Sequence, residues 1–160
     1  MNLSPLGANV SQRGAVERLN IGHRLLQDEG IRNYVHQGVC YDAVAFTKFL
    51  LGAPIDVNSL LNLYGPDWKP VFNFLAGRLW LGEPIDVGTA VGFQYVHNGD
   101  IFHTSIALGG HRIRGENGHR LGNGWISIGD SDLSRLEQVS RGVYRLPNEN
   151  VELRVWLSFL

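Results

Sequence analysis

Apolar side chains in the first half of the chain recur at the three- and four-residue spacing of an amphipathic helix. The pattern predicts helices over residues 14–28, 39–51, 59–63 and 70–81. Residues 1–12 carry little periodicity, and we expect them to form a loose N-terminal arm. The apolar stripes that define the first two helices are Val16, Leu19, His23 and Leu26, and then Val39, Ala43, Phe46 and Leu50.

The period shifts towards two after residue 88, where glycine also becomes frequent. The cleanest alternation of apolar and polar side chains lies over residues 151–159. Helices followed by antiparallel strands indicate a single α+β domain over residues 1–160, with N-terminal helices packed on an antiparallel β-sheet. Alternation and Asn-Gly turn pairs predict strands over 91–96, 101–108, 111–116, 125–128, 143–146 and 151–159. We also expect a brief helix over 131–139.

Composition places the chain among folded globular proteins. Of its 160 residues, 44% are hydrophobic and 18% are charged, which is incompatible with disorder. The formal net charge of −1 gives no electrostatic reason to expect a nucleic-acid partner. No segment is apolar for long enough to span a membrane, and the N-terminus lacks the charged and apolar regions of a Sec-type signal. We therefore expect a protein that is cytoplasmic in its producer, or one that a specialised system secretes.

The chain has a single cysteine, Cys40, which excludes an intramolecular disulfide and a cysteine-based zinc site. We expect no metal and no cofactor. Cys40 falls in the first turn of the helix predicted over 39–51, where the helix dipole and free backbone N–H groups favour a thiolate and could hold an oxyanion. Tyr34, Gln37 and Tyr41 are close enough in sequence to donate to the same oxyanion. A lone cysteine is also common as a plain core residue.

His103 is the candidate partner of Cys40. It lies in the strand predicted over 101–108, and the small Ser105 on the same face leaves room for a helix end to approach. A cysteine on a helix facing a histidine on a sheet is a recognised arrangement for a thiol nucleophile. A third group normally orients the imidazole, and it should come from the next strand or turn. The sequence does not choose among Asn117, Glu116 and His119 for this third position.

Two segments resemble the NlpC/P60-type members of the papain-like cysteine hydrolases. They are Val39-Cys40-Tyr41-Asp42-Ala43-Val44-Ala45-Phe46, and His103-Thr104-Ser105-Ile106-Ala107-Leu108-Gly109-Gly110 preceded by Val91-Gly92-Phe93. Tyr41-Asp42 stands where this family usually has Ser-Gly. The resemblance implies a papain-like fold, amide-bond cleavage through a thioester on Cys40, and His103 as the base.

The same resemblance suggests substrates and partners. Many members of the family cut peptidoglycan stem peptides, and small members include toxins and effectors that are injected into other cells. We therefore expect a peptide or protein substrate, which includes peptidoglycan. A toxin would also have a cognate inhibitor or immunity protein.

Other functions remain open. Related thiol enzymes deamidate glutamine or transfer acyl groups with the same pair of residues. A non-catalytic binding module is a different class, whose recognition surface would use the aromatic residues and the glycine-rich 109–124 segment, with three arginines as an anion-binding patch. The side chains concerned are Trp68, Trp80, Trp125 and Trp156, and Arg112, Arg114 and Arg120.

Overall fold

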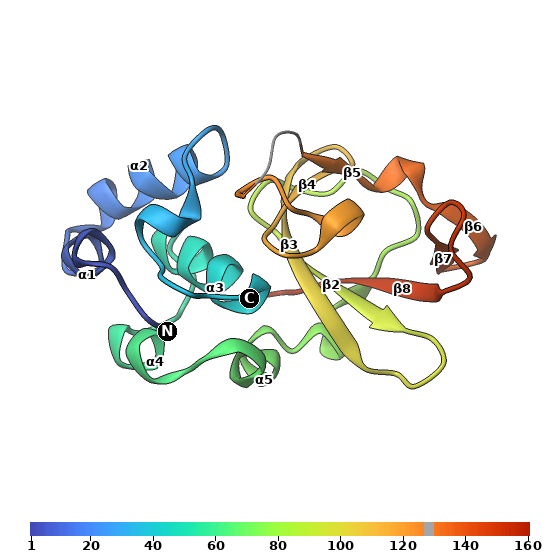
Figure 1. Cartoon of the computed structure of the whole chain (residues 1–160), viewed down its shortest axis with the longest axis horizontal. Helices are drawn as coiled ribbons and strands as arrows, with labels where there is room; N and C mark the ends of the chain where they lie inside the picture. The colour runs from blue at the N-terminus through green and yellow to red at the C-terminus, as the bar shows by residue number, and fades with distance from the viewer. Residues whose placement is uncertain (127–129) are drawn as a thin grey trace.

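The computed structural model describes residues 1–126 and 130–160 and combines a helical half with a curled antiparallel sheet (Figure 1). The α-helices are α1 (Pro5–Ser11), α2 (Ala15–Leu25), α3 (Cys40–Leu50), α4 (Val57–Asn62) and α5 (Lys69–Phe72). Short 3-10 turns are η1 (Ile31–Asn33), η2 (Gly65–Trp68), η3 (Phe74–Ala76), η4 (His119–Leu121) and η5 (Leu133–Arg135). The strands are β1 (Arg78–Leu79), β2 (Ala90–Tyr95), β3 (Ile101–Gly109), β4 (Arg112–Arg114), β5 (Ser131–Asp132), β6 (Glu137–Ser140), β7 (Val143–Arg145) and β8 (Glu152–Leu157).

The sheet has the strand order β5-β4-β3-β2-β8-β7-β6, and β1 pairs with the C-terminal end of β8. All of these pairings are antiparallel. The β2–β3 hairpin turns at Asn98-Gly99, and Gly99 has the positive φ of 74° that this turn requires. In the hairpin, Phe93 is the register partner of His103. The hairpin therefore fixes His103 near the middle of the sheet.

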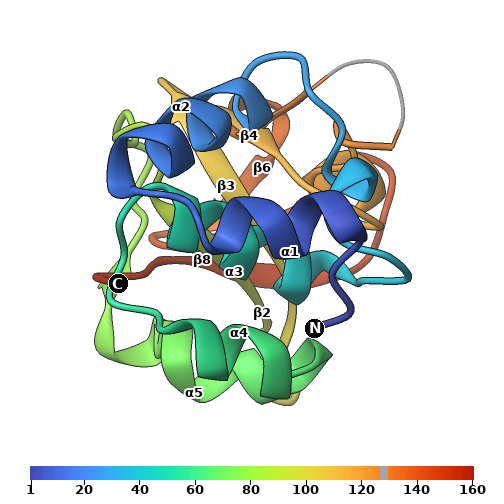
Figure 2. The same ribbon diagram turned by 90° about the vertical axis from the view of Figure 1, so that its left-hand side faces the viewer.

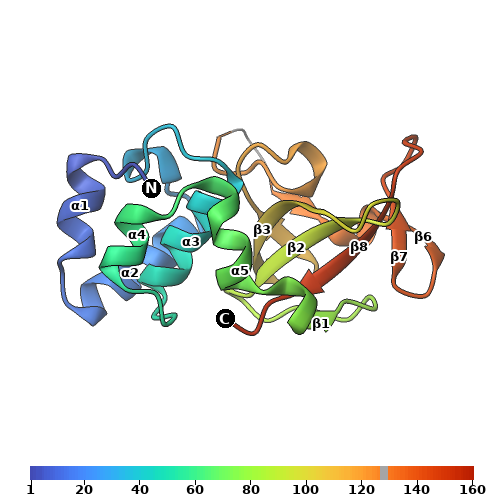
Figure 3. The same cartoon turned by 90° about the horizontal axis from the view of Figure 1, so that it is seen from below.

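Helix α3 lies between the outer helices and the sheet. It packs against α2 on one side and β3 on the other, while α1 contacts α2 (Figures 2 and 3). Ten of its eleven residues are buried, and Lys48 is the exception. Because α3 is covered on both sides, its first residue, Cys40, is carried to the boundary between the helices and the sheet.

The N-terminal residues are ordered, so the expectation of a loose arm over 1–12 was wrong. Ser4 caps α1 by accepting a hydrogen bond from the Gly7 N–H at 3.0 Å. Leu3 forms an isolated β-bridge with Val35. The buried Met1 and Val10 side chains join the core. This segment is too short to show periodicity, but its few apolar side chains anchor it.

Two predicted helices were wrong because strand pairing overrides their local pattern. The helix expected over 70–81 ends at Phe72, because Asn73 adopts a left-handed conformation with φ 49°. At Gly77 the backbone then passes so close to β8 that an added Cβ would lie 2.0 Å from the Leu157 carbonyl oxygen. The helix expected over 131–139 is β5, η5 and β6 instead, paired with β4 and β7.

Three further expectations concern the buried face of α2, the strand over 125–128 and membrane-spanning helices. The stripe predicted for α2 was right at Leu26, which is buried, and wrong at Val16, Leu19 and His23, which are exposed. Gly22 and Leu25 form the buried face of the helix instead. Of the strand expected over 125–128, the first two residues form a turn, and residues 127 and 128 lie outside the described part. Within residues 1–126 and 130–160, no helix is both long and apolar enough to cross a membrane.

Candidate functional site

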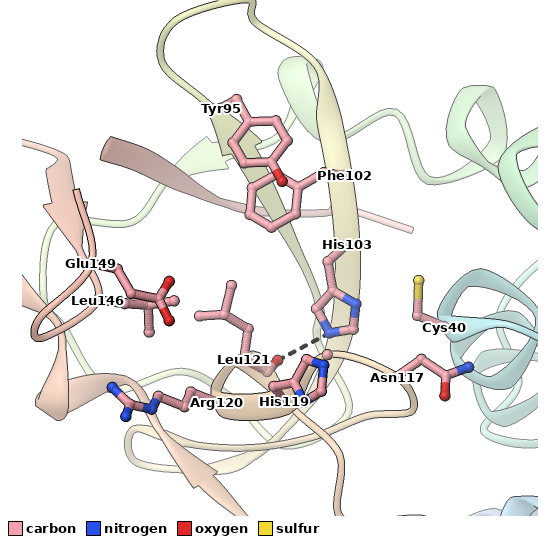
Figure 4. A pocket seen from close by; sticks show the side chains of 11 residues that line it. Cys40, Tyr95, Phe102, His103, Asn117, His119, Arg120, Leu121, Leu146 and Glu149 are labelled. Atoms are coloured by element: carbon pink, nitrogen blue, oxygen red, sulfur yellow. Dashed lines mark hydrogen bonds between the residues drawn. The ribbon is translucent and has the colours of Figure 1, made fainter. Parts of the chain in front are cut away.

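Cys40 and His103 meet at one pocket of about 570 Å³ (Figure 4). Cys40 comes from the first turn of α3 and His103 from β3. The relative exposure is 7% for Cys40 and 4% for His103, so both residues are largely shielded from solvent. Both residues line this pocket, and in Figure 4 the Cys40 side chain lies on the side of the His103 ring that faces away from Leu121. The structure thus brings together the two residues that the sequence analysis paired.

Asp42 holds the chain around the start of α3. Its carboxylate accepts the Val39 N–H at 3.0 Å and the Gly65 N–H at 2.9 Å. These bonds fix the segment before Cys40 to the helix and to η2. The first N–H groups of a helix lack intrahelical acceptors, so the N–H of Cys40 is placed to receive an oxyanion.

The Cys40 thiol is a neutral group in this environment. Burial raises its pKa, and the negative charges of Asp42 and Glu116 act in the same direction. The backbone N–H groups of Thr104 and Tyr41 at the sulfur oppose this rise without cancelling it. The backbone N–H of Tyr41 in the first turn of α3 lowers the thiol pKa, as expected of a helix start, but burial outweighs it and the net pKa is raised.

The His103 ring is held in one tautomer by its Nε2 atom. Nε2 lies 3.1 Å from the Leu121 carbonyl oxygen and 3.0 Å from Ser105 Oγ, and the Ser105 hydroxyl donates to the same Leu121 oxygen. A carbonyl oxygen can only accept, so Nε2 carries the ring proton. Nδ1 is then unprotonated, and Figure 4 shows this second nitrogen on the side of Cys40. The ring therefore presents a base to the thiol.

The buried imidazole is also neutral. Burial lowers the pKa of His103 to about 4, while the hydrogen bond to Leu121 acts in the opposite direction and the nearby His119 lowers it slightly further. The thiol and the imidazole consequently form a neutral pair near pH 7.

Three glycines allow the 115–122 loop to approach His103 and Ser105 with its backbone. A Cβ added at Gly118 would lie 2.1 Å from His103 Nε2. A Cβ at Gly115 or Gly122 would lie 2.6 or 2.2 Å from Ser105 Oγ. Such distances leave no room for a side chain. Sequence reasoning assigned Gly118 to a turn only. Three glycines in the eight residues that follow β4 were a signal that the backbone of this loop approaches another part of the protein closely.

Among the candidates for a third residue, Asn117 and His119 line the same pocket as His103, and Glu116 lines a second pocket. The Nε2 hydrogen bonds of His103 go to Leu121 and Ser105 instead. Asn117 lines the pocket with its side-chain amide turned away from the ring in Figure 4, and its backbone N–H donates to Asn123 Oδ1 at 3.0 Å. Glu116 is buried, and its carboxylate pairs with Arg32 Nε at 3.2 Å. His119 lines the pocket at the start of η4. The orienting contact thus comes from a main-chain carbonyl, which sequence reasoning missed.

The three side chains expected to donate to the oxyanion are Tyr34, Gln37 and Tyr41. Both tyrosine hydroxyls bind other groups, and Gln37 lines a different pocket. The Tyr34 hydroxyl donates to the Glu29 carboxylate, and burial followed by this contact raises the pKa of Tyr34 to about 12. The Tyr41 hydroxyl donates to the Ile101 carbonyl oxygen at 2.8 Å, and burial raises its pKa. Gln37 lines a second pocket, of about 440 Å³, together with Glu116 and the exposed Arg32. The backbone N–H of Cys40, in the first turn of α3, remains as a candidate oxyanion donor.

The tryptophans expected on an aromatic recognition surface are mostly buried, and the three arginines expected in an anion-binding patch make contacts within the protein. Trp68, Trp80 and Trp125 are buried, and the half-buried Trp156 donates its indole N–H to Gln94 Oε1 at 2.8 Å. Each of the three arginines is committed to a structural contact: Arg112 and Arg114 bind Asp130, and Arg120 donates to the Pro147 carbonyl oxygen.

No family model matches the chain, and no curated protein matches its sequence. In the described parts of the chain, no group of three or more His, Cys, Asp or Glu side chains is arranged to hold a metal ion.

Proposed function

We propose that the protein is a papain-like cysteine hydrolase that cleaves an amide bond with Cys40 as nucleophile and His103 as base. One observation carries the proposal: Nδ1 of His103 is an unprotonated acceptor on the side of Cys40, because Nε2 is held by the Leu121 carbonyl. A cysteine at a helix start against a histidine on a packed sheet is the arrangement that thiol hydrolases use. The pocket that the two residues share gives a substrate access to both.

The reaction begins with a neutral pair, so proton transfer accompanies attack. The Cys40 thiol gives its proton to His103 Nδ1 while the sulfur bonds to the amide carbon. The carbonyl oxygen becomes an oxyanion, and the N–H of Cys40 stabilises it. The C–N bond then breaks, and Nδ1 returns the proton to the leaving amine, which leaves a thioester on Cys40. Water attacks this thioester, Nδ1 accepts the water proton, and the acid product departs as the thiol regains that proton.

The same thioester supports the neighbouring activities. Loss of ammonia from a glutamine side chain would make the protein a deamidase, and attack by an amine or alcohol instead of water would make it an acyltransferase. The substrate classes that we propose are peptidoglycan stem peptides and target proteins. In a toxin or effector, the pocket would also be the surface that an inhibitor or immunity protein covers.

The thioester can be detected directly. The wild-type protein is mixed with para-nitrophenyl acetate, and intact-mass measurement with peptide mapping locates the acetyl group. We expect acetylation at Cys40, and we expect it to be lost in Cys40→Ala and strongly slowed in His103→Ala. His23→Ala is the matched control, since His23 is exposed on α2 and distant from the pocket lining. The proposal fails if wild-type Cys40 is not acylated, or if His103→Ala is acylated as fast as His23→Ala.

The acceptor and the substrate need separate assays. Purified sacculi, a denatured protein and a glutamine-containing peptide are incubated with the wild type and with Cys40→Ala. Released muropeptides, new peptide termini and ammonia report the three outcomes, and each must depend on Cys40. If none of these products appears although Cys40 is acylated, the hydrolase assignment fails in favour of acyl transfer.

A further inference from the structure

The position of His103 defines which part of a substrate lies in the pocket. Since Nδ1 must protonate the leaving amine, the amine portion sits on the His103 side of the scissile bond. The pocket continues beyond His103, away from Cys40, towards Leu146 and Glu149 (Figure 4). This inference rests on the proposed function: the pocket receives the amine portion of the substrate.

An aromatic wall forms one side of this pocket. The rings of Tyr95 on β2 and Phe102 on β3 are stacked, with centroids 3.8 Å apart and planes 14° from parallel. Phe102 also lies 6.4 Å from Phe93, and Tyr95 lies 5.0 Å from His97 between ring centroids. Because neighbours on the hairpin hold both rings, this wall is preformed and a ligand need not order it.

The rest of the pocket adds apolar surface and two opposite charges. Leu121 and Leu146 line it with the aromatic pair, and Figure 4 places Leu146 and Glu149 at the end remote from Cys40. Arg120 lies at the same end, with its Nη1 bound to the Pro147 carbonyl oxygen at 3.0 Å. One cation and one anion line the same end, so the pocket has no excess charge of either sign there.

We propose that the amine portion of the substrate is uncharged and apolar, of the size of an aromatic or large aliphatic side chain. A volume of about 570 Å³ is within the range of pockets that enclose small ligands, and it is ample for a benzyl group. Burying such a group against Phe102 and Leu146 removes apolar surface from water, which is the term that would give the preference.

The test uses chloroacetamides, in which the substituent on nitrogen occupies the position of the leaving amine. Sulfur bonds to the methylene carbon, chloride leaves, and the thiol proton passes to His103 and then to solvent. The N-methyl, N-benzyl, N-hexyl, N-carboxymethyl and N-aminoethyl compounds are compared by intact mass at mildly alkaline pH, each rate divided by the rate with glutathione. We expect the N-benzyl compound to label Cys40 about tenfold faster than the N-methyl compound, or more, from the burial of a ring. The charged compounds should show no gain.

Substitutions in the pocket test whether the aromatic wall causes the preference for the N-benzyl compound. Phe102→Ala should bring the N-benzyl to N-methyl ratio close to one, and Leu146→Ala should lower it if the first variant does not fold. Phe159→Ala is the matched control, because Phe159 is 79% exposed and lies outside the pocket, and it should keep the wild-type ratio.

Each result has a defined meaning. A faster N-hexyl than N-benzyl rate supports an apolar amine portion that is aliphatic. The inference is overturned if the wild type labels no faster with the N-benzyl or N-hexyl compound than with the N-methyl compound. It is also overturned if a charged compound labels fastest. In both cases Cys40 is still labelled, so the proposed function stands. Failure of every compound to label native Cys40 would remove the basis of both.

Discussion

Gly118→Ala should separate the orientation of His103 from the overall stability of the fold. Gly118 has φ −109°, which alanine also adopts, so the substitution introduces no backbone strain. Its Cβ would nevertheless lie 2.1 Å from His103 Nε2 and 2.6 Å from the Gly122 carbonyl oxygen, whereas ordinary contacts begin at 3.4 Å. The ring or the loop must therefore move by more than an ångström. Either movement also disturbs the bond between Nε2 and the Leu121 oxygen.

The expected magnitudes follow from that displacement. Misplacing a catalytic group by about 1 Å costs on the order of 100-fold in rate. Overpacking a buried site costs about 1–3 kcal/mol of unfolding free energy. We expect acylation of Cys40 by para-nitrophenyl acetate to slow about 100-fold while the protein still folds. Mass spectrometry measures the rate, and urea denaturation measures the stability.

The matched control for this prediction is Gly14→Ala. Gly14 also has an ordinary φ, −65°, and an added Cβ there meets nothing within 4 Å. We expect Gly14→Ala to keep the wild-type rate and to lose only a few tenths of a kcal/mol as a helix N-cap. If Gly118→Ala acylates at the rate of Gly14→Ala, the ring does not depend on the loop, and the orienting role of Leu121 is refuted.

Two further predictions concern pH. Because burial raises the pKa of Cys40, its alkylation by iodoacetamide should keep rising with pH into the alkaline range, and a plateau at mildly acidic pH would contradict the neutral pair. Because the pKa of His103 is lowered from 6.5 to about 4, the unfolded chain binds a proton that the folded one does not between these values. Stability should therefore be fully present above pH 6.5 and fall by about 3 kcal/mol as pH drops to about 4. His103→Gln, followed by urea denaturation across this range, should lose that dependence while His23→Gln keeps it.

The elements that sequence could predict are the ones whose own residues specify them. Helix α3 and strands β2, β3 and β8 have long apolar patterns and clear turn signals, and each was expected within two residues of its observed limits. The segments over 70–81 and 131–139 have helical patterns, but pairing with β8, β4 and β7 determines their structure. Strands β8 and β4 are far from these segments along the chain, so the local pattern does not indicate those pairings. Strand β7 is the other half of a tight hairpin with β6, turned at Gly142.

The same distinction between local and long-range determinants applies to the candidate site. Cys40 and His103 were predictable because residue type, a helix start and a strand face are all properties of the sequence. The direction of the thiol pKa was not, since it depends on how much protein covers the sulfur. The contact that orients His103 was not predictable either, because every residue has a carbonyl and only the fold brings that of Leu121 to Nε2.

A carbonyl in the orienting position has a chemical consequence that a carboxylate would not have. It fixes the tautomer as well as an acidic side chain does, but it supplies no negative charge to stabilise an imidazolium. The buried ring therefore remains neutral, and the buried thiol with it, so neither charge has to be desolvated while the pocket is empty. Charge develops only when the sulfur attacks, at the point where the N–H of Cys40 can receive the oxyanion. A centre of this kind is compatible with the apolar walls of Phe102 and Leu146 beside it, because those walls would destabilise a permanent ion pair and do not penalise a neutral one.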